Sequence, residues 1–226
     1  MSKSNFKSSK KFSNEYTKKL SDYRNALMDS EKRLVICAGL PSTGKTAQAI
    51  DCAVSMVNKE QYEKLIIVRP TLPLSCGLLP GSLLEKMSPY ISQSNKYCDE
   101  FSNTPLFTLI QQEKAEVLPT DALQGNRFSN CVVIFDELQN VSYKETFTLL
   151  SRLGEGSKFI LLGDISTGQL LNKKVKKGET ILDYCIEKFA DENYCSVHQF
   201  YDKDDILGDK ITKKIIIKLL DDFVEL

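Results

Sequence analysis

The sequence contains no tryptophan, a single histidine (His198), and seven scattered cysteines that never form a Cys-x-x-Cys pair. This scarcity excludes a zinc site built from histidine and cysteine at the usual spacing. An odd number of scattered cysteines is typical of reduced thiols and not of a disulfide framework. We therefore expect a cytoplasmic protein.

An excess of one charge sign is also missing, because thirty basic residues balance thirty acidic ones. Net charge therefore gives no argument for binding nucleic acid, and any basic surface must be local. The apolar runs are too short to span a bilayer, and the first residues lack the apolar core of a signal peptide, so we expect no membrane partner. Residues 1–13, rich in Ser, Lys and Asn, are expected to form a mobile basic tail, with a nucleic-acid-binding arm as the alternative.

Residues 14–226 are expected to form one α/β domain. Tyr16, Leu20, Tyr23 and Leu27 have helical spacing and predict one packed helix face. Short apolar runs that favour β-strands then alternate with helical segments, the pattern of a mainly parallel sheet with helices on both faces. The expected strands lie in 33–38, 64–69, 115–118, 131–137, 158–164 and 194–200, and the expected helices in 44–57, 143–153, from 179 onward and at the end of the chain.

The last helix carries an apolar residue at every fourth position: Ile211, Ile215, Leu219 and Phe223. This spacing predicts a face packed against the domain, and contact with another subunit is the alternative.

The stretch AGLPSTGKT, residues 38–46, satisfies the P-loop pattern and joins an expected strand to an expected helix. Glycines in such a loop let backbone N–H groups surround a phosphate at the helix N-terminus. Lys45 would reach the β and γ phosphates of ATP, and the Thr46 hydroxyl would bind Mg²⁺. The expected nucleotide-binding residues are Gly39, Leu40, Pro41, Ser42, Thr43, Gly44, Lys45 and Thr46.

A second motif of nucleotide hydrolysis, CVVIFDE, ends the expected strand at 131–137. Asp136 is the candidate carboxylate for the magnesium shell, and Glu137 the candidate base that orients an attacking water. Two acids after a strand also occur in solvated turns and helix caps, but a P-loop upstream favours the catalytic interpretation.

Three stretches of the sequence resemble the ATPase domain of the PhoH-like family, which is related to superfamily 1 helicases. They are FDELQN, LLSRLGEGSKFILLGD and RPTLPLSCGLLPGSLLEKMSPY. The resemblance runs from about Val35 to the C-terminus. It implies a RecA-like P-loop NTPase fold, Mg²⁺-dependent ATP hydrolysis, ring-shaped homo-oligomers such as a hexamer, and action on RNA or single-stranded DNA. It also assigns Gln139 and Asp164 to the nucleotide site.

Several positions depart from the family pattern. Thr167 stands where the family has a glutamine that senses the γ-phosphate, and Gly208 where it has an arginine. The family's upstream glutamine for adenine is replaced near Leu20. The family's Arg-Gly-Arg before the acidic strand end reads QGNR here, so Arg127 lies one place from the family position. ATP binding therefore carries over better than efficient hydrolysis, and we expect slow turnover.

Other basic residues are candidates with two interpretations each. Arg152 either neutralises phosphate charge beside the site or anchors a helix end by a salt bridge. Arg69, at a strand end, either contacts a nucleic-acid phosphate or pairs with a local acid. A further cluster forms either a nucleic-acid contact or a solvated loop: Lys173, Lys174, Lys176 and Lys177.

The sequence therefore predicts an ATPase with ATP and Mg²⁺ as cofactors, acting on or regulated by RNA or single-stranded DNA. Two other classes remain open. One is an ATP-responsive binding module with little hydrolysis, and the other is a P-loop kinase, which usually adds an arginine-bearing lid.

Overall fold

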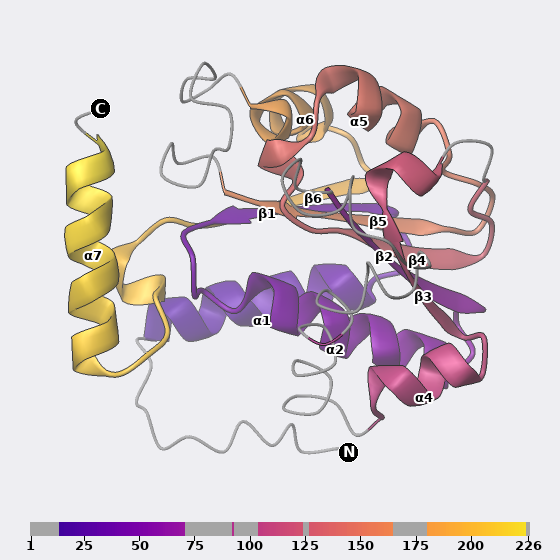
Figure 1. Ribbon diagram of the computed structural model, residues 1–226, viewed down its shortest axis with the longest axis horizontal. Helices are drawn as coiled ribbons and strands as arrows, with labels where there is room; N and C mark the ends of the chain where they lie inside the picture. The colour runs from indigo at the N-terminus through magenta and orange to yellow at the C-terminus, as the bar shows by residue number, and fades with distance from the viewer. Residues whose placement is uncertain (1–13, 71–91, 93–103, 124–126, 165–179, 225–226) are drawn as a thin grey trace, which may run out of the picture.

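The computed structural model describes residues 14–70, 92, 104–123, 127–164 and 180–224 (Figure 1). The expected tail at 1–13, Thr167 and the lysines of 173–177 lie outside the described residues.

The centre of the molecule is one six-stranded sheet whose strand order is β3-β2-β4-β5-β1-β6. All five neighbouring pairs are parallel. β1, β4 and β5 are buried at every position, as expected for apolar strands that are covered on both faces. The strands are β1 (Leu34–Gly39), β2 (Lys64–Arg69), β3 (Ala115–Pro119), β4 (Cys131–Phe135), β5 (Lys158–Gly163) and β6 (Cys195–Phe200).

Helices cover both faces of the sheet, so the molecule has three layers with a hydrophobic core on each side (Figure 1). One face carries α1 (Asn14–Met28), α2 (Lys45–Asn58) and α4 (Leu106–Gln111). The other carries α5 (Tyr143–Leu150) and α6 (Ile181–Phe189). Both α5 and α6 begin at a capping box, which supplies partners for the first free backbone N–H groups. The RecA-like α/β fold that the sequence predicts is therefore confirmed.

Helix α1 confirms the predicted packed face: Tyr16, Tyr23 and Leu27 are buried, and Leu20 packs against the same core. The short helix α4 was not predicted, because its six residues are too few to show helical periodicity. No helix within the described ranges has the length and hydropathy needed to cross a bilayer.

Helix α7 (Lys210–Val224) stands at one end of the molecule, beside the layers and not within them (Figure 1). Its Ile211, Ile215 and Leu219 are 72%, 54% and 52% exposed. The prediction that these residues pack against the domain is therefore wrong. Their spacing shows an apolar row on a helix, but periodicity cannot show whether the same chain covers that row.

Candidate active site

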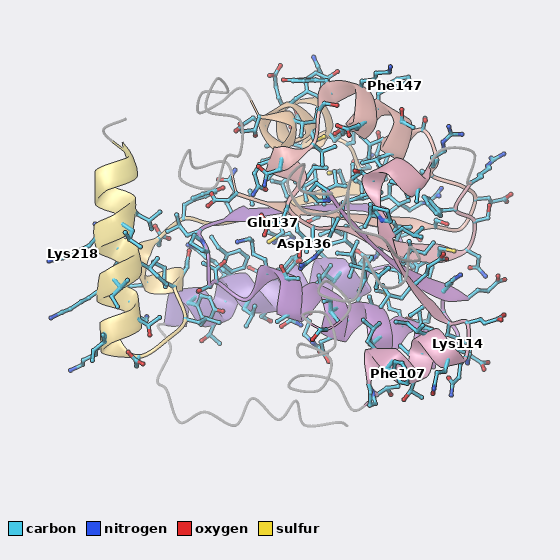
Figure 2. The ribbon with its side chains drawn as sticks, viewed as in Figure 1. Phe107, Lys114, Asp136, Glu137, Phe147 and Lys218 are labelled. Atoms are coloured by element: carbon cyan, nitrogen blue, oxygen red, sulfur yellow. The ribbon has the colours of Figure 1, made fainter. Side chains whose placement is uncertain are left out.

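The carboxyl ends of β1, β4 and β5 bring the two sequence motifs to one edge of the sheet. β5, which Asp164 follows, lies between β1 and β4. β1 ends at Gly39 of the P-loop, and β4 is followed by Asp136. Asp136, which is buried, and Glu137, which is half-buried, lie next to each other (Figure 2). Ligands of open parallel sheets bind at this edge, where loops and helix N-termini meet.

The P-loop makes the strand-to-helix turn that its pattern requires. Gly44, the residue before α2, has a φ of 83°, a conformation that side chains rarely adopt. A β-carbon at Gly39 would lie 2.7 Å from the carbonyl oxygen of Phe200, so only glycine fits there. The carbonyl of Ser42, itself at a φ of 61°, accepts a 2.7 Å hydrogen bond from the Leu207 N–H.

The amine of Lys45 lies inside the loop. Its Nζ donates to the carbonyls of Gly39 and Leu40, both at 2.7 Å, and to the hydroxyl of Thr43 at 3.3 Å. Burial lowers the pKa of this amine, since the charged form loses water. Phosphate oxygens would offer the same amine a charged acceptor in place of neutral carbonyls.

Two tyrosines of α1 donate hydrogen bonds to the backbone of the P-loop. Tyr16 donates from its hydroxyl to the Thr43 carbonyl at 3.1 Å, and Tyr23 donates to the Lys45 carbonyl at 3.4 Å. The sequence pattern predicts only packing for both residues. Tyrosine in place of leucine on a buried helix face was the available signal, because a buried phenol usually finds a hydrogen-bond partner.

Thr46 and Asp136 form the candidate metal site. The Thr46 hydroxyl donates to Asp136 Oδ1 at 3.2 Å, which joins the P-loop to the end of β4. Among the described residues, no group of three or more His, Cys, Asp or Glu side chains is placed to hold a metal ion. A hydroxyl and one carboxylate fit Mg²⁺, which commonly completes its shell with phosphates and water.

Glu137 is held by a chain of hydrogen bonds that crosses to β5. Gln139, in the short 3₁₀ helix Leu138–Asn140, donates from Nε2 to Glu137 Oε2 at 2.7 Å and accepts at Oε1 from the Asp164 N–H at 3.1 Å. Both ends of this amide are therefore engaged inside the protein, and Gln139 orients Glu137. Burial, and then the neighbouring charge of Asp136, raise the pKa of Glu137.

Arg69 is not a surface residue. It is only 6% exposed, and its guanidinium pairs with the carboxylate of Asp136. Of the two interpretations from sequence, pairing with a local acid is the one that the structure shows. The expected contact of Arg69 with nucleic acid is corrected accordingly, because a buried side chain does not face a polymer in solution.

Arg152 lies at the opposite edge of the sheet from the P-loop. Helix α5 starts near the end of β4 and runs back, so the residues after it reach the amino ends of the strands. There the Arg152 carbonyl accepts from the Phe128 N–H at 3.0 Å, and Leu153 bridges to Phe128. The interpretation that Arg152 neutralises phosphate charge beside the site is therefore wrong.

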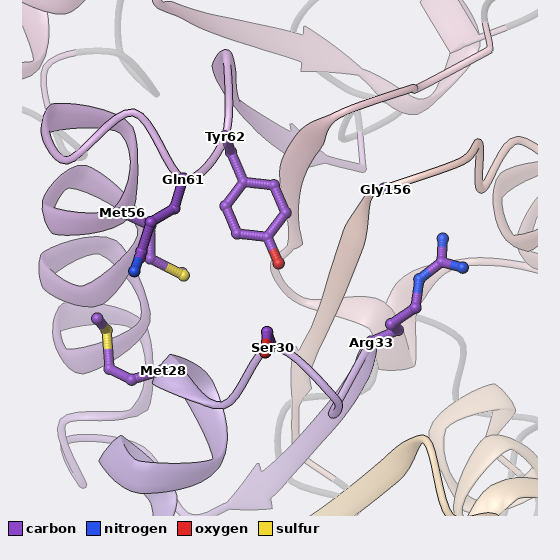
Figure 3. A pocket seen from close by; sticks show the side chains of 7 residues that line it. All are labelled: Met28, Ser30, Arg33, Met56, Gln61, Tyr62 and Gly156. Carbon is purple, nitrogen blue, oxygen red and sulfur yellow. The ribbon is translucent and has the colours of Figure 1, made fainter.

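The amino-terminal edge also holds a pocket of about 340 Å³ between α1, α2 and the turn before β5 (Figure 3). None of the predicted site residues that the structure describes contributes to it. It is lined by Met28, Ser30, Arg33, Met56, Gln61, Tyr62 and Gly156.

Gly208 has a φ of 136°, and a β-carbon there would lie 3.0 Å from the side chain of Thr212. An arginine at this position would strain the backbone. Arg127 is exposed, and so is Lys210, two residues after Gly208.

Comparisons with known proteins identify the family of the chain. The family described as "PhoH-like protein" matches residues 14–219. A PhoH-like protein of Synechocystis is 31% identical over 169 residues, which are 74% of this chain and 51% of that protein. One from Bacillus subtilis is 34% identical over 148 residues, covering 64% of this chain and 46% of the relative. The chain thus spans about half the length of these relatives.

Among solved structures, the large terminase of a thermophilic bacteriophage has a similar fold. It aligns with a TM-score of 0.54 and 15% sequence identity over 91% of this chain and 50% of the terminase chain. Identity this low supports the fold alone. The family match extends over nearly all the described residues and includes both the P-loop and the acidic pair, and we conclude that the chain belongs to the PhoH-like family of P-loop NTPases.

Proposed function

We propose that the protein binds ATP together with Mg²⁺ and hydrolyses it. The observation that carries this proposal is the hydrogen bond between Thr46 and Asp136, because it joins the phosphate-binding loop to the acidic strand end with Glu137 directly beside it. A P-loop that served only as a structural turn would not need a buried carboxylate at its hydroxyl.

Each side chain has a separate task in this mechanism. Lys45 moves from the loop carbonyls to the β and γ phosphates, and Glu137, oriented by Gln139, accepts a proton from the attacking water. Thr46 and Asp136 would hold Mg²⁺, which neutralises phosphate charge when it is bound. Asp164 keeps the Gln139 amide in place through its backbone N–H.

Action on RNA or single-stranded DNA is the second part of the proposal. It is supported by the resemblance to helicase-related ATPases and by the lysines at 173, 174, 176 and 177. Contacts to phosphates release counterions, so binding should weaken steeply as salt is raised.

The test is release of phosphate from MgATP with no acceptor present, measured with and without single-stranded RNA or DNA. We expect slow basal release that rises when the nucleic acid is added. A strict kinase would release none without its substrate, and a binding module would retain ATP without turnover. Either result would contradict the proposed hydrolysis.

We also propose that the chain forms a homo-oligomeric ring. The exposed aliphatic row of α7 supports this, because water-facing isoleucines are unfavourable on an isolated subunit. Helices α5 and α6, which lie on another side of the molecule from α7 (Figure 1), carry a second exposed patch. It consists of Tyr143, Phe147 and Tyr184. Two different patches that meet head to tail close into a ring or extend as a filament.

Replacing Ile215 with aspartate should lower the mass of the assembly, because a charge would be buried at the contact. Light scattering coupled to size-exclusion chromatography measures this mass. Lys18→Asp, at an exposed position of α1, is the control and should leave the mass unchanged. A parent chain that is monomeric, or an Ile215→Asp assembly of parental mass, would contradict the role of α7.

A further inference from the structure

Arg69 and Asp136 meet because their strands are neighbours. In the parallel pairing of β2 with β4, Val68 lies opposite Phe135, so Arg69, the last residue of β2, and Asp136, directly after β4, lie at the same edge of the sheet. The guanidinium Nη2 of Arg69 contacts Asp136 Oδ2, and the two side chains are only 7% and 5% exposed. The pair is therefore shielded from water, where charges interact far more strongly than on a surface.

The two oxygens of Asp136 have different partners. Oδ1 accepts from the Thr46 hydroxyl and from the Glu137 N–H, each at 3.2 Å. Oδ2 faces the guanidinium. The Thr46 hydroxyl can keep donating to Oδ1 while its oxygen binds a metal, so this contact is compatible with Mg²⁺. The guanidinium at Oδ2 is not, because it places a fixed positive charge at the carboxylate that a metal would approach.

The charge of Arg69 is also felt at the candidate base. Burial and the charge of Asp136 raise the pKa of Glu137, and the charges of Arg69 and Lys45 act in the opposite direction. The guanidinium thus compensates an acidic pair that would otherwise be buried with too little positive charge, a situation that costs stability.

We propose that Arg69 is a built-in competitor for the metal: its guanidinium occupies Asp136 Oδ2 in the metal-free protein and yields that oxygen when Mg²⁺ arrives with the nucleotide. This inference rests on the proposed ATP-binding function and adds a regulatory element to it. Free Mg²⁺ must displace a tethered cation, whereas nucleotide phosphates bring the negative charge that favours a second cation. The metal is therefore taken up together with the nucleotide and not before it.

The test measures binding of Mn²⁺, a spectroscopic substitute for Mg²⁺, by the electron paramagnetic resonance of the free ion, without nucleotide. Arg69→Gln should bind Mn²⁺ about tenfold or more tightly than the parent, because removing a buried positive charge beside a carboxylate favours a cation. Arg69→Lys keeps the charge and should remain close to the parent. Arg69→Gln combined with Asp136→Asn should lose the gain, which locates the metal at Asp136.

Equal or weaker Mn²⁺ binding by Arg69→Gln would overturn the proposal. If that variant does not fold in metal-free buffer, Mg²⁺ should restore its folded circular dichroism, and failure of the metal to do so would equally overturn it. MgATP binding by the parent is measured in parallel. Parental binding of MgATP with unchanged Mn²⁺ affinity in the variant refutes only the role of Arg69, whereas no parental binding refutes the proposed function.

Discussion

Glu137→Gln should lower ATP turnover by about 10²- to 10⁴-fold, the usual contribution of a positioned general base. Affinity for ATP should change little, because the amide keeps the size of the carboxylate and the P-loop is untouched. Phosphate release and equilibrium binding of a fluorescent ATP analogue measure the two quantities separately. Glu155→Gln, at an exposed position before β5, is the matched control and should behave as the parent.

The pH dependence of turnover gives a second measure of the same residue. The pKa of Glu137 is raised by burial and by Asp136, and a base works only when it is ionised. Turnover should therefore rise with pH through a value above the ordinary pKa of a glutamate, and Glu137→Gln should remove this limb. Parental turnover in the variant, or an unchanged acidic limb, would show that another group activates the water.

Lys45→Ala should bring phosphate release below detection and weaken ATP binding by about 10- to 100-fold, the loss expected when charged hydrogen bonds to phosphate are removed. The folded state should tolerate the change. Burial lowers the pKa of the Lys45 amine, so its charged form is stabilised less in the folded protein than in water, and the melting temperature should not fall.

Isothermal titration with ATP and thermal unfolding measure these two effects. Lys59→Ala, at the exposed far end of the same helix, is the control and should retain binding and turnover. Parental affinity in Lys45→Ala would mean that the loop does not hold the phosphates. A large drop in melting temperature would mean that the contacts to the Gly39 and Leu40 carbonyls stabilise the fold.

Most strands could be predicted from sequence because they are short apolar runs. β1, β4 and β5 are buried at every position, whereas only the two end residues of β6 are buried. The P-loop was also evident, since its spacing follows from backbone geometry that only glycine provides at Gly39 and Gly44. The sequence did not show which distant residues a single side chain contacts. Nothing in the order of residues shows that Arg69 turns inward to Asp136, or that the turn after α5 carries Arg152 to the far edge of the sheet.

The tyrosines of α1 show a second limit. Helical spacing correctly identified a buried face, but it does not show which buried backbone atoms the phenols reach. Tyr16 and Tyr23 touch a loop that lies more than twenty residues later, and Leu207 touches it from much further along the chain. Contacts over such separations depend on the assembled fold and not on local pattern.

The same contacts indicate when the P-loop reaches its final structure during synthesis of the chain. The P-loop is hydrogen-bonded to Tyr16 near the start of the described chain and to Leu207 near its end. β1, which leads into the P-loop, lies between β5 and β6. Contacts between distant parts of a chain are usually the slow ones to form. A growing polypeptide would therefore acquire its nucleotide site only after β6 and the segment behind it had been synthesised. ATP added during refolding should trap the finished fold without speeding the steps that lead to it.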